Sequence, residues 1–346
     1  MSATQKALWL ESKFGQFKVG ENTVPTPGAG QVLVRVEATG LNPVDWKVQK
    51  YGIFLEKYPA ILGTDIAGVV EAVGEGVTGF ATSDRVLFQG AWEKDFAGYQ
   101  QHTLSEVEIT AKIPAELSYD QAATIPVGIA AAVGGLYLPK PHGANLTPPL
   151  DPSTQGKYAG KPIVVLGGAT SVGQFAIQFA KLSGFSPIIT TASLKNDQRL
   201  KALGATHVLD RHLDTGTLGM QITVIAQGIV EVVFDAVSLA DTQQLGYDVL
   251  AAIGHLTLVL PKADEVKEIK GKSISTVFGV WTLPHSRDLG KKLYSKLTEL
   301  LESGALRPNR VEVLPGGLRG VATGLRRLEA DQVSGVKLVV RPQETA

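Results

Sequence analysis

Residues 163–173 read IVVLGGATSVG, and this stretch decides the fold of the second half of the chain. The apolar run at 163–166 predicts a buried strand, and the glycines after it predict a tight turn into a helix that begins near Val172. Such a turn brings backbone N–H groups and the positive end of a helix dipole onto a pyrophosphate. The pattern Gly-x-Gly-x-x-Gly reads Gly168-x-Thr170-x-x-Gly173 here, so an ordinary strand-to-helix turn stays open as an alternative.

Strand and helix signals alternate beyond this turn. We predict strands at IVVLG, PIITTAS, THVLD, VEVVFDA and HLTLVL, and helices at SVGQFAIQFAKLSG, KNDQRLKALGA, GTLGMQITVIA and DTQQLGYDVLAAI. This alternation predicts a parallel sheet with helices on both faces. The tail adds a predicted helix at 287–303, an amphipathic helix at 319–331 and a last strand at 336–340.

The chain before the turn has a different pattern. Residues 6–115 carry short Val-rich runs broken by Gly and Pro, which predicts a β-rich unit. The Ala-rich stretch 118–138 predicts one connecting helix, capped by Ser118 or Asp120 and kinked or ended by Pro126 and two glycines. Six of the 18 prolines lie between 139 and 162, a composition that predicts an extended surface insertion.

The composition excludes several classes of protein. A length of 346 residues suits two domains, and 33 Lys and Arg balance 33 Asp and Glu, which argues against nucleic acid or an anionic membrane as a partner. The chain has no cysteine, which excludes disulfides, thiolate nucleophiles and Cys-based zinc sites. No signal-peptide pattern and no apolar run of membrane-spanning length is present, so we expect a cytoplasmic protein.

The residues after the second predicted strand bear on which dinucleotide binds. A site for NAD is expected to carry Asp or Glu about twenty residues after the turn, but TTASLKN at 190–196 has no carboxylate. Ser193, Lys195 and Asn196 instead offer donors and a positive charge to a 2′-phosphate, and Arg211 can bind the same phosphate or stack on adenine. NADPH is therefore the predicted cofactor, while exposed surface positions for Lys195 and Arg211 stay open as alternatives. The predicted contacts of the turn itself are Gly168, Ala169, Thr170, Ser171, Val172 and Gly173.

Several segments together resemble a known family. They are GLNPVDWK at 40–47, PAILGTDIAGVVEAVG at 59–74, DRV at 84–86, GGATSVG at 167–173 and SGVKLVV at 334–340. With these segments the chain resembles the medium-chain dehydrogenase/reductase superfamily, in the zinc-free branch of quinone oxidoreductases and fungal trans-acting enoyl reductases. The resemblance implies an α/β protein with a GroES-like β-barrel domain at 1–122 and 300–346. It also implies a doubly wound Rossmann domain for NADPH at 123–299, with the cofactor in the cleft between the two.

The same resemblance predicts that no metal is bound. Zinc members of the superfamily use a Cys and a Gly-His-Glu element, whereas this chain has Asn42 and Gly63-Thr64-Asp65 at those places. The six histidines show no ligand spacing, so each is expected to lie at the surface or in the packing.

Without zinc or a thiolate, the chemistry most accessible to NADPH is hydride addition to a polarised carbon–carbon double bond. Negative charge then develops on the carbonyl oxygen, and a proton returns to the α-carbon. By resemblance Lys47 is the predicted proton source or oxyanion partner, with a surface lysine as the alternative. Asn42 is a predicted contact of substrate or nicotinamide ribose, although Asn before Pro is also an ordinary turn residue. We expect Asp45 to cap a helix and buried Asp65 to bond Arg85 or backbone amides.

Resemblance also suggests where the nicotinamide and the substrate lie. By this resemblance Val237, Leu260, Phe278, Gly279 and Val280 lie in strand-end segments, where their backbone could bond the carboxamide, with plain packing as the alternative. The predicted substrate lining is aromatic and consists of Trp46, Tyr51, Phe54 and Trp281. One departure is Ala131, which stands where many relatives carry a threonine hydroxyl.

These observations lead to one main function and two alternatives. The main prediction is NADPH-dependent, metal-independent reduction of an activated double bond in a small or carrier-bound enone or enoyl substrate. Quinone reduction is a second enzymatic reading, and a non-catalytic NADPH-binding interaction protein is a third of another class. The sequence leaves monomer and homodimer equally open.

Overall fold

The computed structural model describes residues 3–266 and 269–346, which form two compact units. Unit 1 comprises residues 1–127, 293–302 and 308–346, and unit 2 comprises residues 128–292 and 303–307. The chain thus first crosses between units after Val127, a few residues beyond the predicted boundary at 122, and returns at Leu293 rather than at 300. The two units are described separately below.

Unit 1 is built mainly of β-strands in two sheets. A three-stranded sheet has the order β2-β1-β4, and a seven-stranded sheet has the order β15-β16-β3-β5-β6-β8, with β7 paired to β3. The strands are β1 (Thr4–Leu10), β2 (Phe17–Thr23), β3 (Gln31–Gly40), β4 (Ala60–Ile61), β5 (Asp65–Val73), β6 (Arg85–Gln89), β7 (His102–Glu106), β8 (Thr110–Lys112), β15 (Arg310–Val313) and β16 (Val336–Val340).

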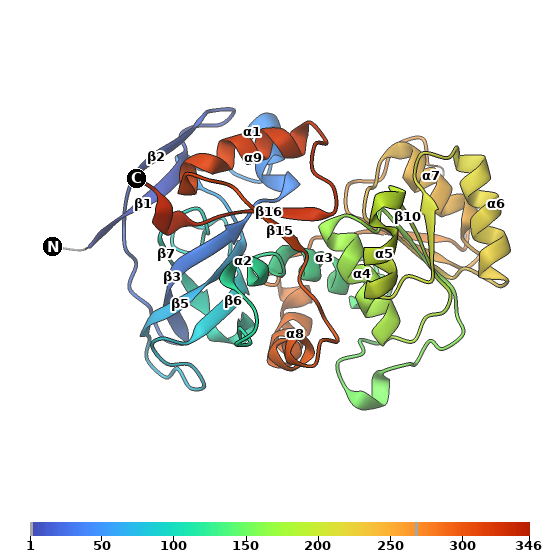
Figure 1. Cartoon of the computed structure of the whole chain (residues 1–346), viewed down its shortest axis with the longest axis horizontal. Coiled ribbons are helices and arrows are strands. Elements are labelled where there is room, and N and C mark those ends of the chain that lie inside the picture. The colour runs from blue at the N-terminus through green and yellow to red at the C-terminus, as the bar shows by residue number, and fades with distance from the viewer. Residues whose placement is uncertain (1–2, 267–268) are drawn as a thin grey trace. The chain divides into compact units, whose positions relative to one another are not determined.

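Strands and helices from the two ends of the chain meet in unit 1. The last strand, β16, lies between β15 and β3 and pairs antiparallel with β3 at Thr39 and Gly40. Helix α9 (Gly320–Glu329) contacts helix α1 (Pro43–Tyr51), so red and blue segments lie together in Figure 1. Their apolar residues share one core with β1 and β4, in which Leu41, Val48 and Leu325 are buried. The remaining helical elements here are α2 (Tyr119–Ala122), η1 (Val107–Ile109), η4 (Gly317–Arg319) and η5 (Pro342–Glu344).

Unit 2 contains a six-stranded sheet whose pairs are all parallel, in the order β11-β10-β9-β12-β13-β14. Numbered from β9, this is the doubly wound order 3-2-1-4-5-6, and the strand order reverses between β9 and β12. The strands are β9 (Ile163–Leu166), β10 (Ile188–Ala192), β11 (His207–Asp210), β12 (Val232–Asp235), β13 (His255–Leu258) and β14 (Ser273–Thr276). The helical elements are α3 (Pro126–Tyr137), η2 (Pro152–Thr154), α4 (Ser171–Leu182), η3 (Leu194–Asn196), α5 (Asp197–Leu203), α6 (Thr215–Ala226), α7 (Ala240–Val249) and the first part of α8 (Pro284–Glu302).

The helices of unit 2 cover the sheet in pairs. Helix α4 contacts α5, and α6 contacts α7 (Figure 1). Because parallel crossovers are right-handed, the reversal of strand order sends these two pairs to opposite faces. Helix α3 approaches β12 and β13 closely at Gly135, where a Cβ atom would lie 2.6 Å from the Phe234 ring. The predicted parallel sheet with helices on both faces is therefore confirmed.

Some predicted elements differ from the structure. The stretch 118–138 forms two helices, α2 and α3, because Pro126 has no N–H to donate and begins a new helix. Ser118 caps the first of them, since its Oγ accepts the N–H of Gln121 at 3.2 Å. The segment 139–162 holds only the short η2, as predicted, but Ala144 and Leu150 are buried, so it is only partly a surface insertion. Strands β14 and β15 were not predicted, because their mixed polar composition lacks an apolar run.

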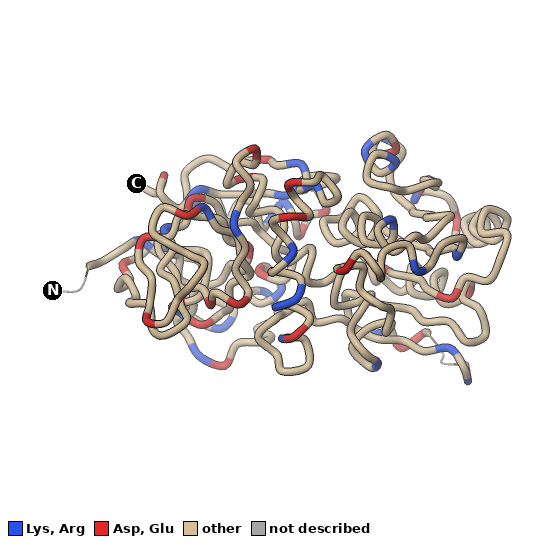
Figure 2. The backbone as a smooth tube through the Cα atoms, turned by 90° about the horizontal axis from the view of Figure 1, so that it is seen from below, with Lys and Arg blue, Asp and Glu red and all other residues tan. Residues whose placement is uncertain are grey.

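Basic and acidic residues are interspersed along the backbone (Figure 2), in keeping with the balanced net charge. Within the described ranges, no helix combines the length and the apolar character needed to cross a membrane.

Candidate functional site

The turn after β9 is organised by Thr170, which caps helix α4. The Thr170 hydroxyl accepts the N–H of Gly173 at 2.9 Å, and the Thr170 N–H donates to the Gly167 carbonyl at 3.0 Å. Threonine therefore supplies a cap at the place where the Gly-x-Gly-x-x-Gly pattern has its middle glycine. The N–H groups of Ser171 and Val172 lie in the first helical turn, where an α-helix offers no acceptor, and are suited to an anion.

The glycines of the turn are required by close contacts. Gly167 has φ of +76°, which favours glycine. A Cβ on Gly168 would lie 2.1 Å from Oγ1 of Thr190, and a Cβ on Gly173 would lie 2.3 Å from the Gly167 carbonyl oxygen. The first helical turn thus packs directly on β9 and β10, which is the geometry of a phosphate-binding turn.

The predicted 2′-phosphate residues follow two neighbouring strands. Ala192 of β10 lies opposite Asp210 of β11, and the Arg211 N–H donates to the Ala192 carbonyl at 3.1 Å. Ser193 and Arg211 therefore leave the same sheet edge side by side. Lys195 and Arg211 are exposed, whereas Asn196 is buried, with 6% of its surface exposed.

The nearby carboxylates have other partners. Asp197, the first acid after β10, forms an ion pair with Lys201 one helical turn away at 3.0 Å. Asp210 accepts the backbone N–H of His212 at 3.1 Å. Lys195 and Arg211 are thus exposed at this edge, and Asp197 is paired with Lys201.

The predicted nicotinamide contacts follow β12, β13 and β14, which are adjacent strands, so the structure brings them to one edge of the sheet. Asp235 fixes the first of these loops, because its Oδ1 accepts the N–H groups of Val237 and Ser238 at 2.9 and 2.8 Å. The Leu260 carbonyl accepts Oγ1 of Thr276 at 3.5 Å.

The third loop, after β14, contains Phe278, Gly279 and Val280. A Cβ on Gly279 would lie 2.7 Å from the Ala131 nitrogen, so this loop passes directly over α3 at the position that lacks the threonine hydroxyl. The Val280 N–H donates to the Phe278 carbonyl at 2.9 Å, and the Phe278 side chain is 54% exposed.

Lys47 lies on α1 of unit 1 and is half-buried. Its Nζ lies 5.6 Å from the centre of the Trp46 ring, and within residues 3–266 and 269–346 it forms no ion pair. Burial lowers the pKa of the Lys47 ammonium. Lys50 on the same helix differs, because its ion pair with Glu329 at 2.6 Å raises its pKa.

Asn42, the residue before α1, belongs to a buried polar cluster. Its Nδ2 donates to Oδ2 of Asp65 at 2.7 Å, and its Oδ1 accepts Nζ of Lys337 at 2.5 Å. Lys337 also forms an ion pair with Oδ2 of Asp65 at 2.7 Å. Both ends of the Asn42 amide are thus engaged within unit 1. Lys337 is a residue that the sequence analysis missed, because its place in the apolar strand run VKLVV gave no sign of a partner 272 positions away at Asp65.

The predicted partners of Asp65 are half right. Its Oδ1 accepts the backbone N–H of Val127 at 2.6 Å, as expected for a buried carboxylate. Arg85 is not a partner, because its guanidinium donates to the carbonyls of Pro114, Ala115 and Leu117 instead. Lys337 takes the place that was predicted for Arg85.

Asp45 caps helix α1, as predicted. Its Oδ2 accepts the Asn42 N–H at 2.9 Å and the Tyr99 hydroxyl at 2.7 Å. Burial outweighs these hydrogen bonds and raises the Asp45 pKa to about 6. Burial also raises the pKa of Tyr99. A Cβ on Gly63, which has φ of +83°, would lie 2.4 Å from the Tyr99 ring, so glycine is needed to seat the tyrosine.

The predicted substrate aromatics fall into two groups. In unit 1, the Trp46 and Tyr51 rings lie 5.9 Å apart, and Phe54 stacks on Trp92 at 5.7 Å. Tyr51 and Phe54 are 52% and 56% exposed and can contact a ligand. Trp281 in unit 2 is only 1% exposed and packs on Gly290, which weighs against a substrate contact by its side chain.

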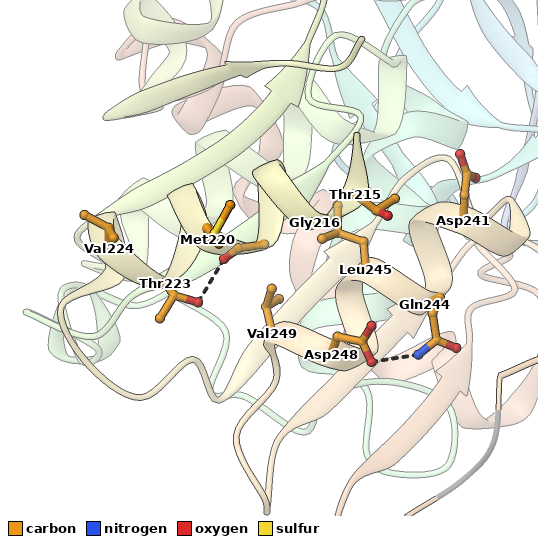
Figure 3. A pocket seen from close by; sticks show the side chains of 11 residues that line it. Thr215, Gly216, Met220, Thr223, Val224, Asp241, Gln244, Leu245, Asp248 and Val249 are labelled. Carbon is orange, nitrogen blue, oxygen red and sulfur yellow. Dashed lines mark hydrogen bonds between the residues drawn. The ribbon is translucent and has the colours of Figure 1, made fainter. Parts of the chain in front are cut away.

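A cavity of about 710 Å³ lies between α6 and α7 (Figure 3). It is lined by Thr215, Gly216, Gly219, Met220, Thr223, Val224, Asp241, Gln244, Leu245, Asp248 and Val249. None of the predicted cofactor or substrate residues is among them, so this cavity is separate from the candidate site.

The described parts of the chain contain no group of three or more His, Asp or Glu side chains that could hold a metal ion. Among the histidines, His255 lies buried between the Ser273 and Ser275 hydroxyls at 2.8 and 2.9 Å, and burial lowers its pKa to about 4. His142 and His285 stack on each other with ring centres 3.8 Å apart.

Comparison with known proteins agrees with this architecture. Residues 28–116 match the alcohol dehydrogenase GroES-like domain, and residues 171–282 match the domain family named zinc-binding dehydrogenase. The trans-enoyl reductase grgB of Penicillium sp is 30% identical, with 98% of this chain and 99% of that protein covered. The dehydrogenase orsE of Emericella nidulans is 32% identical with the same coverage.

Solved structures share the fold. The quinone oxidoreductase of Coxiella burnetii has a TM-score of 0.73 at 24% identity, covering 98% of this chain and 99% of that one. A mycobacterial protein solved in complex with NADPH has a TM-score of 0.76 at 22% identity, covering 98% and 100%.

Fold and site together define a two-domain oxidoreductase with a GroES-like unit and a nicotinamide-binding Rossmann unit. The chain belongs to the medium-chain dehydrogenase/reductase superfamily, among its fungal trans-enoyl reductases and related dehydrogenases.

Proposed function

We propose that the protein reduces an activated carbon–carbon double bond in an enone or enoyl substrate, with NADPH as the cofactor and without a metal. The observation that carries the proposal is Lys47, a half-buried lysine beside Trp46 whose ammonium has a lowered pKa and forms no ion pair in the described ranges. Relatives named trans-enoyl reductases that match over nearly the whole chain support the same reaction class.

Unit 2 has the features that a dinucleotide needs. The first turn of α4, with N–H groups of Ser171 and Val172, suits the pyrophosphate. We assign Ser193, Lys195 and Arg211 to the 2′-phosphate, because both cations are exposed at one sheet edge and a guanidinium binds phosphate in two-point fashion. Asp197 does not compete, since it is paired with Lys201.

The reduced nicotinamide, when bound, supplies a hydride to the substrate. The chain's part is to supply the proton and to favour negative charge on the substrate carbonyl oxygen. Lys47 can do both, because burial makes its ammonium a stronger acid than an exposed lysine. Tyr51 and Phe54 provide exposed apolar surface for the body of the substrate.

Asn42 has a different assignment from the one its sequence suggests. Its amide is held by Asp65 and Lys337, so we assign it to holding α1 rather than to touching substrate. We further propose that unit 1 carries substrate residues, that unit 2 carries the cofactor, and that the protein works in the cytoplasm on a small or carrier-bound substrate.

A second candidate function is quinone reduction. The exposed rings of Tyr51 and Phe54 favour a flat conjugated acceptor, and a quinone is a doubly activated enone of that shape. The same protein chemistry would then serve a different acceptor.

The test is to titrate the purified protein with NADPH and NADH, and then to follow NADPH oxidation with enones, enoyl thioesters and quinones. We expect tighter binding of NADPH and turnover of an enone or enoyl thioester. Turnover of quinones alone would favour the second candidate. Binding without turnover of any acceptor would contradict both and indicate a non-catalytic cofactor-binding protein, while a preference for NADH would contradict the assignment of Lys195 and Arg211.

A further inference from the structure

The polar cluster around Lys337 is a closed arrangement of charges inside unit 1. Lys337 and Asp65 are 3% and 0% exposed, and their side chains form an ion pair at 2.7 Å. Asn42, 5% exposed, bonds both of them, and the Val127 N–H donates to the second oxygen of Asp65. Charges buried to this degree lose their hydration, and apolar side chains of similar size would fill the space at less cost. Stability therefore does not explain why these groups are buried in unit 1.

The cluster is attached to the start of helix α1. Asn42 is the residue that precedes the helix, and its backbone N–H donates to Asp45 in the first turn. Asp45 is held in turn by the Tyr99 hydroxyl. The direction in which α1 leaves β3 is thus set by two buried carboxylates, Asp65 through the Asn42 side chain and Asp45 through the Asn42 backbone.

The other end of α1 is held by partly exposed contacts. Gln49 Nε2 donates to the Gly15 carbonyl at 2.9 Å, and Lys50 forms a surface ion pair with Glu329, whose side chains are 52% and 37% exposed. Exposed pairs of this kind fix a side chain weakly. Lys47 lies between the two ends, and the N-terminal end is the one held by buried charged groups.

We propose that Asp65 and Lys337 form a positioning pair, which holds Asn42 and α1 so that Lys47 stays half-buried at the place from which it delivers a proton. This inference rests on the proposed function for the role of Lys47. Neither Asp65 nor Lys337 touches substrate in this assignment; both act through Asn42. The groups that face the pair in unit 1 are Asp45, Tyr99 and, by its charge interaction with Asp65, Tyr294.

The test uses the full chain with both charges removed, as Asp65→Asn/Lys337→Met. The paired variant removes both charges of the ion pair together, so neither partner is left buried without the other, and it is expected to fold where Lys337→Met alone can fail. We expect kcat with an enone to fall by between about tenfold and a hundredfold, because small displacements of a catalytic group have effects of this size. Affinity for NADPH is expected to stay unchanged, since the predicted cofactor residues lie in unit 2.

A second readout reports on Lys47 itself. The rate at which acetic anhydride modifies Lys47 is followed by mass spectrometry across the alkaline range. In the Asp65→Asn/Lys337→Met variant, α1 is no longer held and water is expected to reach the Lys47 ammonium. The pH midpoint of the modification therefore moves to higher pH. The alkaline limb of the kcat profile is expected to move in the same direction. A purely structural role would lower stability without moving this midpoint.

The control is Lys50→Met/Glu329→Gln, which removes the surface ion pair from the other end of the same helix. It is expected to leave kcat and the Lys47 midpoint unchanged. The proposal would be overturned if the Asp65→Asn/Lys337→Met variant folds and keeps the wild-type kcat and Lys47 midpoint. Effects equal to those of the control would also overturn it. If the wild-type protein reduces no acceptor, the proposed function fails, and the Lys47 midpoint still decides whether the pair positions the lysine.

Discussion

The phosphate-binding turn of unit 2 and the polar cluster of unit 1 are built in opposite ways. The turn uses backbone groups from one continuous stretch. In it the Thr170 hydroxyl caps helix α4 by accepting the N–H of Gly173, three residues later. The cluster uses polar and charged side chains from distant positions, with Asn42, Asp65 and Lys337 brought together by strand pairing. A site made from the backbone needs glycines and a cap, whereas a site made from side chains needs the whole fold.

This difference also affects how each site responds to substitution. In the turn, steric space is critical and charge is not. In the cluster, each charged group depends on another, so a single substitution leaves a partner buried and uncompensated.

Lys47→Met tests the proposed role of the Lys47 side chain in unit 1, and its effect is expected to be the largest. We expect kcat with an enone to fall by roughly 10²- to 10⁴-fold, the usual range for loss of a general acid, with NADPH affinity unchanged. Steady-state kinetics and a fluorescence titration measure the two quantities. The matched control is Lys50→Met on the same helix. An activity loss of similar size in both variants would refute the assignment of Lys47.

Gly173→Ala tests the turn of unit 2, which is built from backbone groups. The new Cβ would lie 2.3 Å from the Gly167 carbonyl oxygen, so the turn has to open. We expect the free energy of unfolding to fall by about 1–3 kcal/mol, together with weaker NADPH binding. Denaturant unfolding checks the first effect. Gly219→Ala in α6, where a Cβ meets nothing closer than 3.7 Å, should instead gain about 0.5–1 kcal/mol.

Features built from one continuous stretch of sequence were predicted better than features that join distant residues. The turn into a helix and all five strands from β9 to β13 were predicted, because each is encoded by an apolar run and its flanking residues, whereas the cap by Thr170 was not predicted. The last strand was predicted at its observed bounds, Val336–Val340. A break at Pro126 was anticipated, because proline has no N–H to donate. The mixed strands β14 and β15 were not predicted, since they depend on neighbours rather than on local pattern.

For the candidate site, the sequence found Asn42, Asp45 and Asp65 but not what joins them. Arg85 was offered beside backbone amides as a partner of Asp65, yet its guanidinium donates to the carbonyls of Pro114 and Ala115. Lys337 supplies the charge instead. A buried lysine within an apolar strand is itself a usable signal, because such a charge needs an acidic partner.

Arg211→Gln sharpens the account of the cofactor. Losing one charged contact to the 2′-phosphate is expected to weaken NADPH binding by roughly tenfold, while NADH binding stays the same. Parallel titrations with both cofactors measure the change in preference. Equal weakening for the two cofactors would mean that Arg211 contacts a part they share, such as adenine.

Asp45→Asn and Asp235→Asn compare one buried carboxyl group in each unit. Burial raises the pKa of both to about 6 in the folded protein, against 3.8 for the unfolded chain. Folding therefore favours the protonated form, so each group contributes stability that is full below pH 3.8 and is lost as the pH rises through about 6. Over this pH range the free energy of unfolding of the wild-type protein should fall by on the order of 2 kcal/mol for each group. Each variant should lack the part of this fall that its own carboxyl group contributes. Unfolding free energies measured across the range test this, and a variant whose pH dependence matches the wild type would rule out the shift for that group.

The most direct test of the central claim is to run the reaction with NADPH deuterated at the transferred position and to locate the label in the product. Reduction of an activated double bond predicts one deuterium on the β-carbon, a solvent proton on the α-carbon and an intact carbonyl group. Deuterium on the carbonyl carbon, with an alcohol as the product, would contradict the account.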